Sequence, residues 1–175
     1  MTDSFRRIHV RKEQFKFAAA HMTVFPDGSK ESLHGHNYTV ELTVDLAHSS
    51  SSSDEWILFS DLKAPLLKIC QSWDEHVLLP LQCKYLKVQS APAEFKNSLD
   101  FILCGKRYIL PADEVVGLNV TNVTVETLAE EFCRQYVELL TAEKSILAKI
   151  RALVIRIDES PGQGASFFWT PGKQK

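Results

Sequence analysis

The chain has 175 residues, of which 45% are hydrophobic and 24% are charged, as expected of one globular domain that needs no disulfide bonds. Twenty Lys and Arg against 22 Asp and Glu give a net charge of −2, which disfavours binding to nucleic acid. No apolar run approaches the roughly 20 residues of a membrane span, and the first residues lack the apolar core of a signal peptide. We therefore expect a single domain over residues 1–175 in a cytoplasmic protein that binds neither membrane nor nucleic acid.

Two long strands are predicted near the N-terminus. Phe5 to Met22 alternates between apolar and polar residues, with an interruption at Lys12 and Glu13 that indicates a bulge. Asn37 to Leu46 alternates without a break. Each strand has one apolar face, so the two are expected to be antiparallel neighbours. The serine-rich stretch 49–53 is typical of a loop.

Two helices and several shorter strands are predicted after this loop. Ser60 to Trp73 has a helical spacing of apolar residues, and Pro65 is expected to confine the regular helix to the residues that follow it. Thr124 is the expected N-cap of the second helix, whose apolar stripe comprises Leu128, Ala129, Phe132, Cys133, Tyr136 and Leu140. The further strands are expected at 85–89, 99–110 (folded back at residues 105–106), 153–158 and 165–169. This order of elements predicts an α+β fold with an antiparallel sheet.

Three histidines form a candidate metal site. His34 and His36 project to the same side of the second strand, and His21 ends the first strand, so antiparallel pairing would bring it beside them. Three neutral imidazoles leave the fourth position of Zn²⁺ open, as in catalytic zinc sites. Gly35 between them allows a ligand or another backbone to come close. The alternative is two ordinary strand histidines bonded to polar neighbours, and the segment 17–21 upstream favours the metal.

Six short motifs in this order resemble the 6-pyruvoyl-tetrahydropterin synthase family, which includes the 6-carboxy-tetrahydropterin synthases of deazapurine biosynthesis. The motifs are Phe17–His21, Leu33–Tyr38, Phe59–Lys63, His76 with its acidic neighbours, Val123–Ala129 and Ile157–Ser160. The resemblance implies the tunnelling fold, an α+β unit with a four-stranded antiparallel sheet and two helices on one face. Such units form a homotrimer or homohexamer around a barrel of strands, with active sites at subunit interfaces. An extra strand-rich insertion is expected near 82–118, where it either lines the substrate entrance or extends the sheet.

The resemblance also implies the ligands of the family. The substrate is 7,8-dihydroneopterin triphosphate, and the cofactor is Zn²⁺ held by three histidines that match His21, His34 and His36. Glu159 matches the carboxylate that accepts the N–H edge of the pterin ring, a charge-assisted contact. Thr124 matches a position near the pterin. Without the family context, Glu159 is a surface carboxylate and Thr124 only a helix cap.

The sequence departs from the family at the general base. The usual catalytic cysteine, four residues before the first histidine of the pair, is Lys30 here. Glu31 lies three residues before His34 and resembles family variants in which glutamate replaces cysteine and the product is 6-hydroxymethyl-7,8-dihydropterin, a folate precursor. A carboxylate whose pKa is raised by partial desolvation can serve as a base near Zn²⁺. The alternative is an exposed glutamate without a function.

The acid/base histidine shows a second departure. His76 is expected to fill this role, with Asp74 as the residue that orients its imidazole and Glu75 as the open alternative. Together these features predict a zinc-dependent lyase that converts 7,8-dihydroneopterin triphosphate to a 6-pyruvoyl, 6-hydroxymethyl or 6-carboxy pterin. The alternative is a catalytically silent pterin- or purine-binding protein that retains the zinc site.

Overall fold

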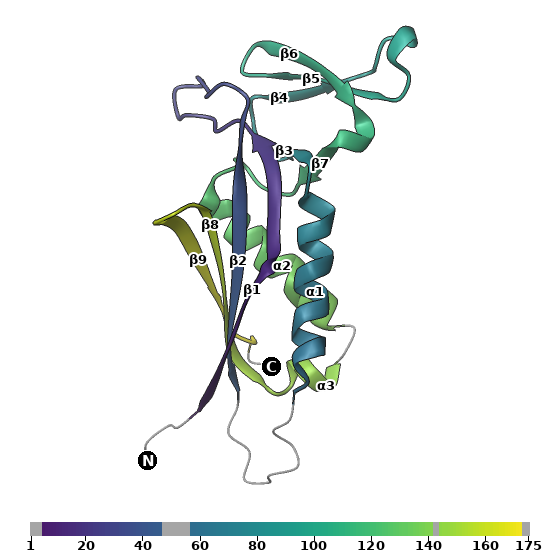
Figure 1. Ribbon diagram of the computed structural model, residues 1–175. Helices are drawn as coiled ribbons and strands as arrows, with labels where there is room; N and C mark the ends of the chain where they lie inside the picture. The colour runs from purple at the N-terminus through teal and green to yellow at the C-terminus, as the bar shows by residue number, and fades with distance from the viewer. Residues whose placement is uncertain (1–4, 47–56, 142–143, 173–175) are drawn as a thin grey trace.

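A computed structural model describes residues 5–46, 57–141 and 144–172 (Figure 1). The strands are β1 (Arg6–His21), β2 (His34–Leu46), β3 (His76–Pro80), β4 (Leu86–Gln89), β5 (Ser98–Leu103), β6 (Lys106–Pro111), β7 (Val115–Leu118), β8 (Ile150–Ser160) and β9 (Gln163–Trp169). The helices are α1 (Phe59–Trp73), α2 (Val125–Thr141) and the short α3 (Lys144–Leu147), with 3-10 turns at Ala93–Phe95 and Ala112–Glu114. The loop predicted at 49–53 lies outside the described residues.

The main sheet has six strands in the order β7-β3-β1-β2-β8-β9. The predicted antiparallel neighbours β1 and β2 are confirmed, and β8 and β9 continue the antiparallel ladder. The prediction of a four-stranded antiparallel sheet was wrong, because β3 is parallel to β1 and β7 is parallel to β3. Both added strands have four or five residues and lack the alternation that marks a half-buried strand.

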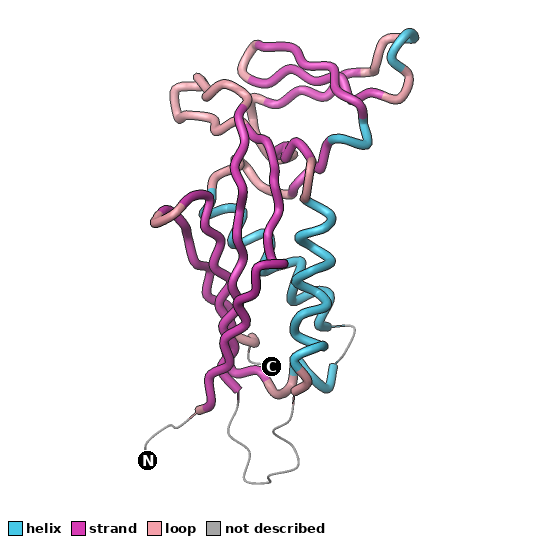
Figure 2. Tube along the Cα trace, viewed as in Figure 1, coloured by secondary structure: helices cyan, strands magenta, loops and turns pink. Residues whose placement is uncertain are grey.

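Helices α1 and α2 cover one face of this sheet, as predicted (Figure 2). Leu62, Leu66 and Trp73 of α1 are buried against the sheet, and the whole predicted stripe of α2 is buried too. The expectation that Pro65 would confine the regular helix to later residues was wrong, because α1 begins at Phe59. Burying Leu62 ahead of the proline offsets the backbone hydrogen bond that a proline removes. No helix in the described part of the chain is long and apolar enough to cross a membrane.

The predicted bulge in β1 is confirmed and keeps one face of the strand apolar. Arg11 pairs with Glu41, but Lys16 pairs with Thr39, so five steps along β1 match two steps along β2. Val10 and Phe15 lie an odd number of residues apart and are nevertheless both buried. The extra residues reset the alternation, and His21 therefore ends β1 on the buried, helix-facing side.

The strand-rich segment between α1 and α2 forms two structures. Strand β7 extends the main sheet, whereas β4, β5 and β6 form a separate antiparallel sheet that folds back at Gly105 as predicted. This small sheet lies at the end of the molecule where β1 ends (Figure 1). Phe101 and Leu103 form its buried core together with Met22 and Leu79. The small sheet therefore packs directly on the chain that follows β1.

Candidate metal centre and active site

The structure brings the three predicted metal ligands together at the end of β1 and the start of β2. Strand pairing places His21 opposite His34 and Ala19 opposite His36. One ligand nitrogen of each imidazole lies within 4.8 Å of those of the other two. His21 is buried, while His34 and His36 are half-buried, so the cluster is open on one side. Since alternate residues of β2 share a face, His34 and His36 lie on the same helix-facing side as Tyr38.

Hydrogen bonds to main-chain carbonyls set the orientation of two imidazoles. His21 Nδ1 lies 3.0 Å from the Val123 carbonyl oxygen, and His34 Nδ1 lies 2.9 Å from that of Ser32. A carbonyl only accepts, so both Nδ1 atoms carry a proton, and in the neutral imidazole each Nε2 atom keeps a lone pair. His21 Nε2 is buried without a hydrogen-bond partner among the described residues. Burial also lowers the pKa of His21 and favours the neutral imidazole.

These three nitrogens fit a metal ion. Zinc–nitrogen bonds of about 2.0–2.1 Å put two ligands of a tetrahedral ion roughly 3.4 Å apart, so a contraction of at most about 1.4 Å would close the cluster on an ion. Metal-bound histidines normally donate the other ring N–H to a carbonyl or carboxylate, as His21 and His34 do here. The buried Nε2 of His21, which has no other partner among the described residues, would bind the metal ion. His21, His34 and His36 could thus hold a metal ion with a position left open for another group.

Gly35 is required by the close pairing of the two strands. A Cβ at this position would lie 2.9 Å from the carbonyl oxygen of Ala19. The close approach expected at Gly35 is therefore that of the neighbouring backbone. Any larger residue would force β1 and β2 apart between two of the three histidines.

Glu31 lies beside the histidine cluster, in the loop that joins β1 to β2. Its Oε2 is 3.7 Å from His34 Nε2, and its side chain is 40% exposed. The raised pKa that the sequence suggested for a base is not found. A hydrogen bond from Thr23, reinforced by the nearby histidines and only partly opposed by desolvation, lowers the pKa of Glu31. The carboxylate is therefore ionised at neutral pH and can accept a proton.

Glu159 and Tyr38 lie further along the same face of the sheet. Thr39 pairs with Asp158, so the next antiparallel pair of β2 and β8 brings Glu159 beside Tyr38. On its other edge, β8 shifts its register with β9 between Asp158 and Ser160. The Tyr38 hydroxyl is buried without a hydrogen-bond partner in the described structure. Burial, and then the charge of Glu159, raise the pKa of Tyr38 well above its ordinary value. Sequence analysis took Tyr38 only as a strand residue, although its spacing of two from His36 places it on the face of the ligands.

Thr124 caps α2, as predicted. The Leu128 N–H donates to its carbonyl oxygen at 2.9 Å, and its hydroxyl accepts from the Thr127 N–H at 3.5 Å. The residue before it, Val123, supplies the carbonyl that accepts from His21. The start of α2 is therefore tied to the histidine cluster, and Thr124 lies one residue from that contact.

Asp74 contacts His76 in a different way from the one predicted. The His76 Nδ1–H donates to the main-chain carbonyl of Asp74, whereas the Asp74 carboxylate accepts from the Ala18 N–H at 2.7 Å. The Glu75 N–H donates to the Ala18 carbonyl, also at 2.7 Å, and Glu75 adopts a left-handed φ of 58°. Asp74 and Glu75 thus attach the start of β3 to the edge of β1. Within the described chain, His76 makes no hydrogen bond to the histidine cluster.

His76 and His36 line one open pocket of about 350 Å³, together with Glu75. The remaining lining comes mainly from residues that alternate with the buried ones, such as Ala18, Ala20 and Asn37. The pocket lies where β1, β2 and β3 meet, beside His36 of the cluster. Ala19 pairs with both His36 and His76, so the strand register places His76 on the same side of the sheet as the histidine cluster.

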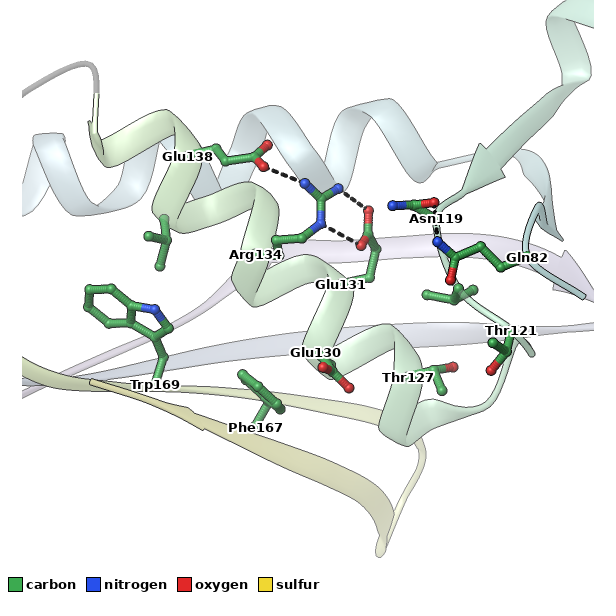
Figure 3. Close-up of a pocket in the computed structure, with 12 residues that line it drawn as sticks. Gln82, Asn119, Thr121, Thr127, Glu130, Glu131, Arg134, Glu138, Phe167 and Trp169 are labelled. Atoms are coloured by element: carbon green, nitrogen blue, oxygen red, sulfur yellow. Dashed lines mark hydrogen bonds and ion pairs between the residues drawn. The ribbon is translucent and has the colours of Figure 1, made fainter. Parts of the chain in front are cut away.

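A second pocket, of about 510 Å³, lies between α2 and β9 (Figure 3). Arg134 lies between Glu131 and Glu138 on one side, and Phe167 and Trp169 project from β9 on the other. No predicted site residue lines it. Its residues are scattered over three segments of the sequence, so no local motif could have indicated it.

Comparison with solved structures gives the class of fold. The 6-pyruvoyl tetrahydropterin synthase of Plasmodium falciparum superposes with a TM-score of 0.83 at 26% identity, over 96% of this chain and 99% of that one. The synthase of Plasmodium vivax gives 0.82 at 24% identity, over 97% and 100% of the two chains. Two further structures of the P. vivax protein carry alanine or cysteine in place of a catalytic glutamate. The fold is that of the pterin synthases.

Sequence comparison gives the family. Residues 9–168 match the family model described as 6-pyruvoyl tetrahydropterin synthase. A Methanocaldococcus jannaschii protein assigned the name 6-carboxy-5,6,7,8-tetrahydropterin synthase is 26% identical over 156 residues, which cover 87% of this chain and 88% of that protein. The chain therefore belongs to the 6-pyruvoyl tetrahydropterin synthase family and is an enzyme of the pterin synthase type.

Proposed function

We propose that this protein is a zinc-dependent lyase that acts on 7,8-dihydroneopterin triphosphate and forms a 6-pyruvoyl, 6-hydroxymethyl or 6-carboxy pterin. The observation that carries the proposal is the convergence of three imidazole nitrogens beside an ionised carboxylate, 3.7 Å from His34. Three neutral imidazoles and an open position suit catalytic zinc. Membership of the pterin synthase family supplies the substrate class.

Each residue has a role in this proposal. Glu31 takes a proton from the side chain of the substrate, because it is ionised and lies at the open side of the cluster. Glu159 accepts the N–H edge of the pterin, and its register position puts it on the same face as His36. Thr124 lies beside the pterin at the start of α2. Zn²⁺ bound to the histidines would supply a Lewis acid for the side-chain hydroxyls of the substrate.

A catalytic glutamate has a precedent within this fold. In the P. vivax synthase a glutamate is a catalytic residue. In this chain the corresponding chemistry would fall to Glu31, since Lys30 stands where a cysteine base would be expected. The identity of this base bears on which bond breaks, so it also bears on the product.

The acid/base role of His76 is proposed to act between subunits. Strand β9 forms one edge of the main sheet, and β1 pairs with β3 only at Ala19 and Ala20, so no described strand pairs with the outer edge of β1 over residues 7–17. Strand edges of this kind pair with another chain. A homotrimer or homohexamer that joins these edges would place His76 of one protomer near the cluster of the next.

The first test is incubation of the zinc-loaded protein with 7,8-dihydroneopterin triphosphate, followed by mass spectrometry of the pterins formed. A 6-hydroxymethyl product would support Glu31 as the base that replaces cysteine. Binding of the pterin by calorimetry without any product would instead support a catalytically silent relative. His34→Ala should abolish zinc-dependent turnover, and full activity of a protein shown to be free of zinc would refute the proposal.

A further inference from the structure

The loop 22–33, which we name the base loop, joins two candidate metal ligands and carries the candidate base. It leaves β1 at His21, enters β2 at His34, and contains Glu31. The two ends of the loop are fixed by strand pairing, because His21 and His34 lie opposite each other. The path of the chain between them therefore decides where the Glu31 carboxylate lies.

One side of the base loop is attached to the segment before α2. Asn122 Oδ1 accepts from the Val24 N–H, and Asn122 Nδ2 donates to the Val24 carbonyl, both at 2.9 Å. Val24 forms an antiparallel bridge with Lys30, and the Glu31 N–H donates to the Thr23 carbonyl at 3.0 Å. These bonds hold the backbone of the loop on the side of the helices.

The other side of the base loop contacts the small sheet β4-β5-β6. Lys30 Nζ lies 5.2 Å from the centre of the Tyr108 ring in β6, a distance at which the ring attracts a cation. Tyr108 stacks in turn on Phe101, with ring centres 5.3 Å apart, and Phe101 is fully buried. The core of the small sheet is thus connected to Lys30 through one aromatic pair.

Lys30 connects this aromatic pair to the base itself. Its Nζ donates to the main-chain carbonyl of Glu31 at 2.9 Å. Within the described residues the ammonium makes no ion pair with the Glu31 carboxylate, although the two residues are adjacent. The Tyr108 ring and the Glu31 carbonyl hold the ammonium away, which leaves the carboxylate beside His34.

The tip of the base loop contacts Tyr85, the residue just before β4, independently. A Cβ at Gly28 would lie 3.1 Å from Tyr85 Cε1, so the ring packs on the bare backbone of the loop. Gly28 has a φ of +85°, which a glycine adopts without strain. The Tyr85 hydroxyl also lies 3.5 Å from the Pro26 carbonyl. Two aromatic residues of the segment 82–111 therefore contact the base loop at separate points.

We propose that Lys30 and Tyr108 are positioning residues through which the small sheet holds Glu31 in its reactive place beside the histidine cluster. The inference rests on the proposed function, in which Glu31 is the base. In this proposal the strand-rich segment 82–111 affects turnover through the position of Glu31. It does not act on the three histidines. Without the Tyr108 ring, the Lys30 ammonium is free to pair with the carboxylate of Glu31 and neutralise the base.

Steady-state kinetics on paired variants test this inference. Tyr108→Leu and Lys30→Met should each lower kcat about tenfold with KM within about twofold, because a small displacement of a catalytic group mainly affects the rate. Tyr108→Phe should restore the rate, since a phenyl ring also binds a cation. The double variant should be no slower than the slower single variant, because both remove one interaction.

The matched control is Val88→Ala, at an exposed residue of the same sheet that lies outside its buried cluster. This control should keep the wild-type kcat. Zinc content should be equal in all variants. Equal kcat in wild type and Tyr108→Leu, or a Tyr108→Phe variant as slow as Tyr108→Leu, would overturn the proposal.

Hydrogen exchange of the peptide 22–33 separates this inference from the proposed function. Tyr108→Leu and Lys30→Met should speed exchange in this peptide, whereas Val88→Ala should not. If the wild-type protein forms no pterin product, the proposed function fails. Faster exchange would then still show that the small sheet holds the loop, and unchanged exchange in both variants would refute it.

Discussion

Gly35→Ala tests whether close pairing of β1 and β2 sets the geometry of the histidine cluster. The added Cβ would lie 2.9 Å from the carbonyl oxygen of Ala19. A carbon and a carbonyl oxygen normally approach no closer than roughly 3.3 Å, so the strands must move apart locally by about 0.4 Å. Backbone surrounds the contact on both sides, and no flexible side chain can yield instead.

The expected magnitude follows from the position of the ligands. His21 lies on β1, whereas His34 and His36 lie on β2 on either side of Gly35, so a separation of the strands changes the distances between the three nitrogens. Changes to the groups that orient metal ligands typically cost about 10–100-fold in metal affinity. Overpacking of a tight contact also destabilises the fold by about 1–3 kcal/mol.

The assay is competition for zinc between the protein and a chelating indicator, combined with thermal unfolding of the metal-free protein. Gly35→Ala should weaken zinc binding about 10–100-fold and lower the Tm by about 2–4 °C for each kcal/mol lost. Gly172→Ala is the matched control, because no atom lies within 4 Å of its added Cβ. It should leave both measurements near their wild-type values.

The reasoning fails if Gly35→Ala binds zinc as tightly as the wild-type protein. That result would show that the strands can separate without disturbing the cluster. A variant with weaker zinc binding but an unchanged Tm would place the effect at the ligands alone. A lower Tm with unchanged affinity would contradict the link between strand pairing and the cluster.

Three further predictions concern the base, the oligomer and the small sheet. Glu31→Gln should stay folded and bind zinc, while kcat falls about 10²- to 10⁴-fold as expected for loss of a general base, and an unchanged kcat would assign the base elsewhere. If His76 acts between subunits, mixing inactive Glu31→Ala and His76→Ala proteins under exchange conditions should restore about a quarter of the activity, whereas no restoration would place both groups in one protomer. Asp100 is buried and ion-paired to Arg107, which lowers the pKa of its carboxyl. This stabilisation is therefore present above about pH 4 and is lost as pH falls through the lowered pKa. The Tm of Asp100→Asn should lie below that of the wild type at neutral pH, and the difference should become smaller in acid.

Local patterns in the sequence predicted the antiparallel part of the fold well. The alternation in β1, with its bulge, and the stripe of α2 depend on neighbouring residues that face one core. Strands β3 and β7 were not predicted, because His76–Pro80 is a short apolar run whose parallel partners lie far away in the chain. Pro65 was misjudged for the same reason, since burial of α1 against the sheet outweighs the local signal.

In the candidate site too, features that depend on local sequence were predicted, and features that depend on distant residues were not. The gathering of His21, His34 and His36 follows from strand pairing, and both parts of that argument are visible in the sequence. The hydrogen bonds of Asp74 could not be predicted in this way, because its carboxylate accepts from the backbone N–H of Ala18, which is remote in sequence. The lowered pKa of Glu31 likewise depends on Thr23, which folds back across the loop.

The metal ligands lie on paired strands and the candidate base lies on a loop, and this separation affects how such an enzyme can change its chemistry. The three imidazoles are held by a rigid ladder, whereas the base belongs to a connection of twelve residues that ends at two of them. Substitutions in that connection can exchange one proton acceptor for another while the ladder keeps its metal-binding geometry. The outcome of the reaction can therefore diverge among relatives without any alteration of the histidines.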